Sequence, residues 1–189
     1  MSHSQFALLK TKRFLPLFMT QFLGAFNDNV FKNALIILIT YFAADKLGVD
    51  SRILVTAAAG LFILPFFLFS ALAGQLVDKF EKSGFIRRIK ILEIILMILA
   101  SIGFYMENVT ILMTVLFMMG VQSAFFGPVK YSILPDILKK DELIGANALV
   151  EAGTFLAILL GTILGGVLIL VENGSTIISV IVMAMASLG

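Results

Sequence analysis

Long apolar stretches separated by short polar ones dominate the chain. A helix that spans a bilayer takes roughly 20 mostly apolar residues, and these stretches approach or exceed that length. They lack the strict alternation of apolar and polar residues that marks the strands of a membrane barrel. The pattern therefore predicts an all-α membrane protein with six transmembrane helices, over about 14–42, 53–77, 89–106, 110–134, 144–171 and 175–189.

The two ends of the chain complete this division into segments. We expect residues 1–13 to form a cytoplasmic N-terminal tail and residues 14–189 to form one six-helix transmembrane domain whose last helix is cut short at Gly189. The first apolar stretch is too long for a cleaved signal peptide, and it contains Asn27-Asp28-Asn29. We therefore interpret it as the first membrane span.

Basic residues mark the cytoplasmic side of the membrane, because loops on that side carry an excess of Lys and Arg. One side has only Lys46 and Arg52. The other side has Lys10, Lys12, Arg13, Lys79, Lys82, Arg87, Arg88, Lys90, Lys139 and Lys140. This asymmetry predicts a cytoplasmic N-terminus. Glu93 follows the basic cluster, and we expect its side chain to reach back toward that surface.

Polar side chains fall on one face of the first predicted helix. Asp28 lies midway between Phe14 and Phe42, where an ionisable group costs about 2.5–3.5 kcal/mol and is by default a candidate functional residue. Helical spacing puts five of the residues around Asp28 on one face of this helix and two asparagines beside that face. The face holds Gln21, Gly24, Ala25, Asp28 and Lys32, and the flank holds Asn29 and Asn33.

The opposite face of this helix is apolar and is expected to contact lipid; it carries Phe22, Phe26, Val30 and Ile37. The polar face is then expected to line an internal cavity. The alternative is that Asp28 and Lys32, four residues apart, form a local ion pair that only holds helices together.

Two later segments also carry polar groups at depth. Gln122 lies inside the fourth segment, and Pro128 predicts a kink shortly before Lys130. Glu151 lies about 10 Å inside the fifth segment, at 1.5 Å per residue. Lys130 and Glu151 are thus at similar depth and could pair between adjacent helices, although Lys130 could instead extend to the membrane surface.

Small residues recur every fourth position in the fifth segment, at Gly153, Ala157, Gly161 and Gly165. Such a face lets two membrane helices approach closely. We expect it to serve packing.

Composition excludes several classes of protein. The chain is 60% hydrophobic and 14% charged, with a mean hydropathy of +1.05, which a soluble domain of 189 residues could not bury. It has no cysteine and one histidine, His3, so thiol chemistry and most metal sites are excluded. We expect no cofactor and no enzymatic activity. A net charge of +2 gives no reason to expect nucleic-acid binding.

The loop after the second segment resembles the cytoplasmic motif of the major facilitator superfamily. The residues that carry it are Gly74, Leu76, Asp78, Lys79, Arg87 and Arg88. The resemblance implies an N-terminal six-helix bundle built as a 3+3 inverted repeat. It also implies gating roles for Asp78, Arg87 and Arg88.

Three longer stretches resemble bacterial lysophospholipid transporters, and most closely the transporter domain fused to acyltransferase and acyl-ligase enzymes. They are residues 21–29 (QFLGAFNDN), 127–135 (GPVKYSILP) and 145–151 (GANALVE). The resemblance covers nearly the whole chain. It implies the N-terminal half of a twelve-helix transporter in the bacterial inner membrane, which moves lysophospholipids to the cytoplasmic leaflet by alternating access.

On this basis we expect the headgroup of a lysophospholipid to bind Asp28, Asn29, Lys32, Asn33, Gln21 and Gln122. Lys130 and Glu151 would form a charge pair that changes between conformations. The expected partners are membrane lipids, the missing six-helix half and an acyltransferase, fused or separate. Two other functions stay open: a proton-coupled exporter of drugs or small solutes, and a membrane anchor for a fused acyltransferase.

Overall fold

The computed structural model describes residues 5–43 and 48–189, so the expectations for His3 and Lys46 lie outside the described residues. The described part of the chain is mostly helical and contains no strand. Its long helices are α1 (Leu15–Leu38), α3 (Ser51–Lys79), α4 (Lys82–Tyr105), α5 (Val109–Ser132), α7 (Leu143–Leu168) and α8 (Gly174–Leu188). Short helical segments are η1 (Gln5–Lys10), η2 (Ile39–Ala43), α6 (Leu134–Ile137) and η3 (Lys140–Glu142).

Each apolar segment predicted from the sequence overlaps one of these long helices. The largest difference is at α4, which begins at Lys82 rather than near residue 89. The Glu81 carboxylate caps this helix, accepting hydrogen bonds from the backbone N–H groups of Ser83 (2.8 Å) and Gly84 (2.5 Å). The cap satisfies backbone donors that the first turn leaves free, so the helix starts in the polar loop.

Four helical stretches within the described residues are long and apolar enough to cross a membrane: Leu15–Phe42, Ser51–Lys79, Val109–Ile137 and Lys140–Leu168. The described helices therefore indicate a membrane protein. Two helices fall outside this set. α8 has 15 residues, and α4 carries Lys90 and Glu93 within its length.

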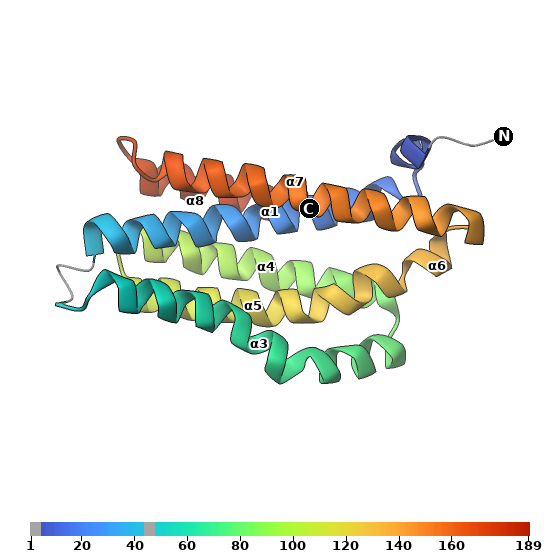
Figure 1. The fold of residues 1–189 in the computed structure, drawn as a ribbon, viewed down its shortest axis with the longest axis horizontal. Coiled ribbons are helices and arrows are strands. Elements are labelled where there is room, and N and C mark those ends of the chain that lie inside the picture. The colour runs from blue at the N-terminus through green and yellow to red at the C-terminus, as the bar shows by residue number, and fades with distance from the viewer. Residues whose placement is uncertain (1–4, 44–47) are drawn as a thin grey trace.

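The long helices run side by side along the longest axis of the molecule (Figure 1). α1 packs mainly against α7 and α8, α3 packs against α5, and α4 bridges α5 and α8. The N-terminal segment, the α3–α4 connection and α6 lie at one end, and the α4–α5 and α7–α8 connections lie at the other (Figure 1). The basic segments of the sequence thus gather at one end of the bundle.

The glycine face of α7 packs directly on α1, as the spacing predicts. Gly161 and Gly165 lie so close to α1 that an added Cβ would be 2.5 Å from the Phe26 carbonyl oxygen and 2.3 Å from the Val30 carbonyl oxygen. This packing corrects one expectation: Phe26 and Val30 do not face lipid but are 9% and 0% exposed. α7 covers α1 on that side because its small residues allow the two helix backbones to approach closely.

Candidate functional site

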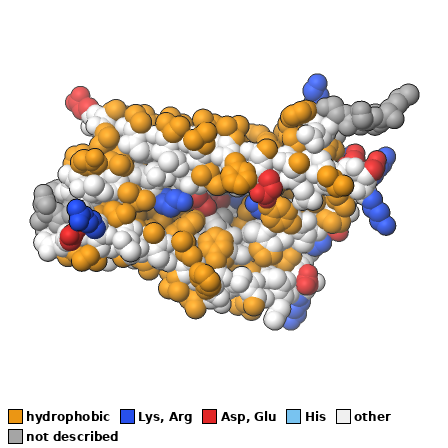
Figure 2. Space-filling model, in the orientation of Figure 1, with side chains coloured by type: hydrophobic (Ala, Val, Ile, Leu, Met, Phe, Trp, Pro, Cys, Tyr) orange, Lys and Arg blue, Asp and Glu red, His pale blue; other side chains and the backbone are white. Residues whose placement is uncertain are grey.

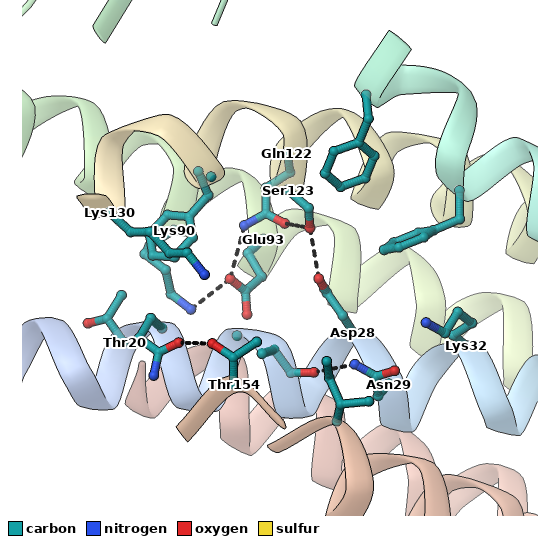
Figure 3. Close-up of a pocket in the computed structure, with 18 residues that line it drawn as sticks. Thr20, Asp28, Asn29, Lys32, Lys90, Glu93, Gln122, Ser123, Lys130 and Thr154 are labelled. Atoms are coloured by element: carbon teal, nitrogen blue, oxygen red, sulfur yellow. Dashed lines mark hydrogen bonds and ion pairs between the residues drawn. The ribbon is translucent and has the colours of Figure 1, made fainter. Parts of the chain in front are cut away.

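A cavity of about 330 Å³ lies among α1, α3, α4, α5 and α7. Aromatic side chains from α3 and α5 form its apolar wall: Phe62, Phe66 and Phe126. Charged side chains from three helices share the same space: Asp28, Lys32, Lys90, Glu93 and Lys130 (Figure 3). Figure 2 shows charged side chains in the middle of a face that is otherwise largely apolar.

The polar face of α1 lines this cavity, which confirms the helical-spacing prediction. Gln21, Gly24, Ala25, Asp28 and Lys32 all contribute, together with Asn29. Gln122 of α5, also predicted to bind substrate, faces the cavity from the opposite side. Asn33 does not line it. The Asn33 side chain instead donates to the Asn29 carbonyl oxygen (2.9 Å) and to the Thr162 hydroxyl of α7 (3.2 Å).

Asp28 is bound across the cavity rather than along its own helix. The Ser123 hydroxyl of α5 donates to the Asp28 carboxylate at 2.7 Å. No ion pair joins Asp28 to Lys32 within the described residues. The Lys32 ammonium lies 4.9 Å from the centroid of the Phe62 ring, in a cation–π contact with α3. The local pair considered from the sequence is therefore not formed, and both charged groups are directed toward neighbouring helices.

Glu93 is the site residue that the sequence interpretation missed. Its side chain does not reach the basic surface; it is 2% exposed and lies inside the bundle. It accepts hydrogen bonds from the Asn27 amide of α1 (3.3 Å) and the Gln122 amide of α5 (3.3 Å), and it pairs with the Lys90 ammonium (2.6 Å). The amides of Asn27 and Gln122, on two other helices, were the available indication that a buried acceptor lies between them.

Lys90 is displaced from its predicted place for the same reason. We assigned it to the basic cytoplasmic cluster, but it lines the cavity beside Glu93. It therefore leaves the set of loop cations that indicate orientation. The remaining residues of that set still outnumber the basic residues assigned to the other side.

Lys130 and Glu151 are neighbours but not direct partners. The Tyr131 hydroxyl donates to the Glu151 carboxylate, and the Lys130 ammonium lies 4.8 Å from the centroid of the Tyr131 ring. The expected contact between α5 and α7 thus runs through an aromatic ring. α5 stays helical through Pro128 as far as Ser132.

Asp78, Arg87 and Arg88 lie outside the cavity. All three side chains are exposed, at the end of α3 and in the first turns of α4. They belong to the same end of the molecule as the N-terminal segment (Figure 1).

The cavity can hold a molecule that carries both charges and an apolar part. Carboxylates such as Asp28 accept hydrogen bonds from an ammonium group, and Lys side chains attract a phosphate. Aromatic rings offer apolar contact and cation–π stabilisation. The thiol and imidazole groups that support much enzymatic chemistry are absent from the cavity lining.

Comparison with known proteins agrees with this chemistry. The family model described as Major Facilitator Superfamily matches residues 17–189. A protein named lysophospholipid transporter LplT from Salmonella heidelberg (strain SL476) is 33% identical over 160 residues, and its namesakes from Salmonella newport (strain SL254) and Salmonella enteritidis PT4 (strain P125109) are 32% identical. Each match covers 84% of this chain and 36% of the relative, so the matched region spans about a third of the relatives' length. No solved structure matches the chain.

Proposed function

The chain belongs to the major facilitator superfamily, and we propose that it is part of a secondary transporter that moves lysophospholipids across the bacterial inner membrane toward the cytoplasmic leaflet. The observation that carries the proposal is the cavity, where Asp28 sits with three lysines against an aromatic wall. A lysophospholipid combines a charged headgroup with one acyl chain, which matches this mixed lining. The name of the relatives supports the same substrate class.

The proposed architecture is the N-terminal half of a twelve-helix transporter. α1, α3, α4, α5, α7 and α8 would be its six spans, arranged as two inverted groups of three. In this arrangement the cavity is completed by a second six-helix half, which would be the main partner.

The proposed headgroup site uses the predicted residues at the cavity. The Asp28 carboxylate would accept hydrogen bonds from the ammonium of an ethanolamine headgroup. Additional hydrogen bonds would come from Asn29, Gln21 and Gln122, and Lys32 would add a positive charge. Asn33 would act from the flank, where it ties α1 to α7 through Thr162.

Alternating access requires contacts that differ between the inward- and outward-facing states. Lys130, Tyr131 and Glu151 form one candidate contact, between α5 and α7. Asp78, Arg87 and Arg88 would contribute another, at the end we assign to the cytoplasm from the positive-inside rule. An acyltransferase, fused or separate, would then use the delivered lysophospholipid.

The test measures uptake of lysophosphatidylethanolamine by the full-length transporter in proteoliposomes. We expect Asp28→Asn to abolish uptake, because the neutral amide keeps the size of the side chain but loses the charge that attracts the ammonium. Asp141→Asn is the control, since Asp141 is exposed in η3 and should leave uptake unchanged. Expression and melting temperature of both variants should equal those of the unmodified protein.

Normal uptake by Asp28→Asn would contradict the headgroup assignment. A wild-type transporter that exports amphipathic drugs and ignores lysophosphatidylethanolamine in competition would contradict the substrate class.

A further inference from the structure

The Glu93 carboxylate links three helices through hydrogen bonds at the cavity wall. One carboxylate oxygen accepts from Asn27 of α1, and the other accepts from Lys90 of its own helix and Gln122 of α5. Both oxygens are thus occupied by donors of the protein. Glu93 contributes to the cavity lining, but only 2% of its side chain is exposed.

The Lys90 side chain is more exposed than that of Glu93. Its side chain is 12% exposed and lines the cavity, and the 2.6 Å bond to Glu93 uses one of its three N–H donors. Gly24 of α1 faces the pair: an added Cβ would be 3.7 Å from a Glu93 oxygen and 3.9 Å from the Lys90 nitrogen. The missing side chain at Gly24 leaves the ammonium open to the cavity.

The arrangement attracts an anion. Lys90 and Glu93 both line the cavity, and Lys130 of α5 adds a second ammonium that faces the same space (Figure 3). A phosphate placed here would meet two cations, while both Glu93 oxygens already accept hydrogen bonds from protein donors. Asp28, with its own bond to Ser123, lies farther along α1 and could receive the opposite charge of a zwitterion.

We propose that Lys90 binds the phosphate group of the transported lipid and that Glu93 is a positioning residue that holds the Lys90 ammonium at the cavity wall. This inference rests on the proposed function, which it deepens by assigning the phosphate subsite. The phosphate would accept hydrogen bonds from the Lys90 N–H groups that do not bond to Glu93, so Glu93 would stay in place.

The experiment measures KM and maximal rate for lysophosphatidylethanolamine uptake by the full-length transporter in proteoliposomes. Lys90→Gln should raise KM about tenfold or more, the loss expected for one hydrogen bond to a charged group. Lys90→Arg keeps the charge and should restore most of the affinity. Lys140→Gln removes an exposed cation outside the cavity and should leave KM unchanged.

A double variant separates positioning from binding and protects the fold. Removing one partner of a buried ion pair leaves the other charge uncompensated, which can unfold the protein. Lys90→Gln/Glu93→Gln removes both charges and keeps two amides able to hydrogen-bond. If Glu93 acts through Lys90, the double variant should have the same KM as Lys90→Gln, while independent roles would multiply the two effects.

The outcomes distinguish this inference from the proposed function. Unchanged KM in both Lys90→Gln and the double variant, with normal wild-type uptake, would overturn the phosphate subsite and leave lysophospholipid transport standing. A wild-type transporter that moves no lysophospholipid would overturn the proposed function. Uptake of labelled inorganic phosphate that depends on Lys90, without lipid uptake, would overturn the assignment to a lipid headgroup.

Discussion

Glu81 shows how one residue fixes the start of the helix that carries the buried ion pair. The backbone N–H groups of Gly84 and Ser83 donate to its carboxylate. Because these bonds favour the charged form, and Arg87 adds a weaker attraction, the pKa of Glu81 is held below its ordinary value of 4.5. The cap therefore contributes most when Glu81 is ionised.

The pH dependence of this cap follows from the direction of the shift. A lowered pKa means that the stabilisation is complete above the ordinary value and is lost as the pH falls through the lower, folded-state value. We expect the hydrogen-exchange protection of the Ser83 and Gly84 amides to be lower at an acidic pH well below 4.5 than at neutral pH. Glu81→Ser should keep a flat profile, because its hydroxyl caps the helix without titrating. Equal protection of wild type at both pH values would contradict a charged cap.

At this scale the sequence predicted the side chains whose position depends on helical spacing alone. Asp28 and its neighbours on α1 are an example, because a helix puts every third or fourth residue on one face. Glu93 and Lys90 were misplaced. The direction of these side chains depends on hydrogen bonds that amides of α1 and α5 donate to Glu93. The sequence pattern within residues 89–106 contains no information about those amides.

The contact between α1 and α7 is where two elements determine each other's environment. The glycine spacing of α7 predicted close packing, and the structure confirms it. The identity of the partner was not predictable from α7. For that reason Phe26 and Val30 seemed to face lipid, although they supply the surface on which Gly161 and Gly165 rest.

Two adjacent glycines of α7 give a matched test of this packing. Gly165→Ala would put a Cβ 2.3 Å from the Val30 carbonyl oxygen and 2.8 Å from its Cα, and backbone atoms cannot move aside. We expect a loss of about 1–3 kcal/mol in stability, as for other overpacked sites. At Gly166 no atom lies within 4 Å, so Gly166→Ala should be neutral or stabilising by up to about 1 kcal/mol. Thermal melting of the full-length protein in detergent checks both, and equal melting temperatures would contradict the close approach.

At the scale of the whole molecule, the division of labour among helices explains why they differ in hydropathy. α3 is the most apolar of the candidate spans and also the least buried, so its surface suits lipid. α4 packs against both α5 and α8 and presents Lys90 and Glu93 to the interior, which makes it less apolar than a lipid-facing helix. Apolar length therefore indicates the lipid-facing α3 more readily than α4.

The orientation of the bundle can be tested because the chain contains no cysteine, so each added thiol reports one position. Lys140 and Glu172 are exposed at the two ends of α7. The positive-inside rule puts the Lys140 end in the cytoplasm and the Glu172 end outside, since the basic loops gather with the former. In the full-length transporter with any other cysteines removed, a membrane-impermeant maleimide should label Glu172→Cys in intact cells. It should label Lys140→Cys only after the membrane is opened. Val30→Cys, which is 0% exposed against α7, is the unreactive control. Labelling of Lys140→Cys from outside would invert the proposed topology.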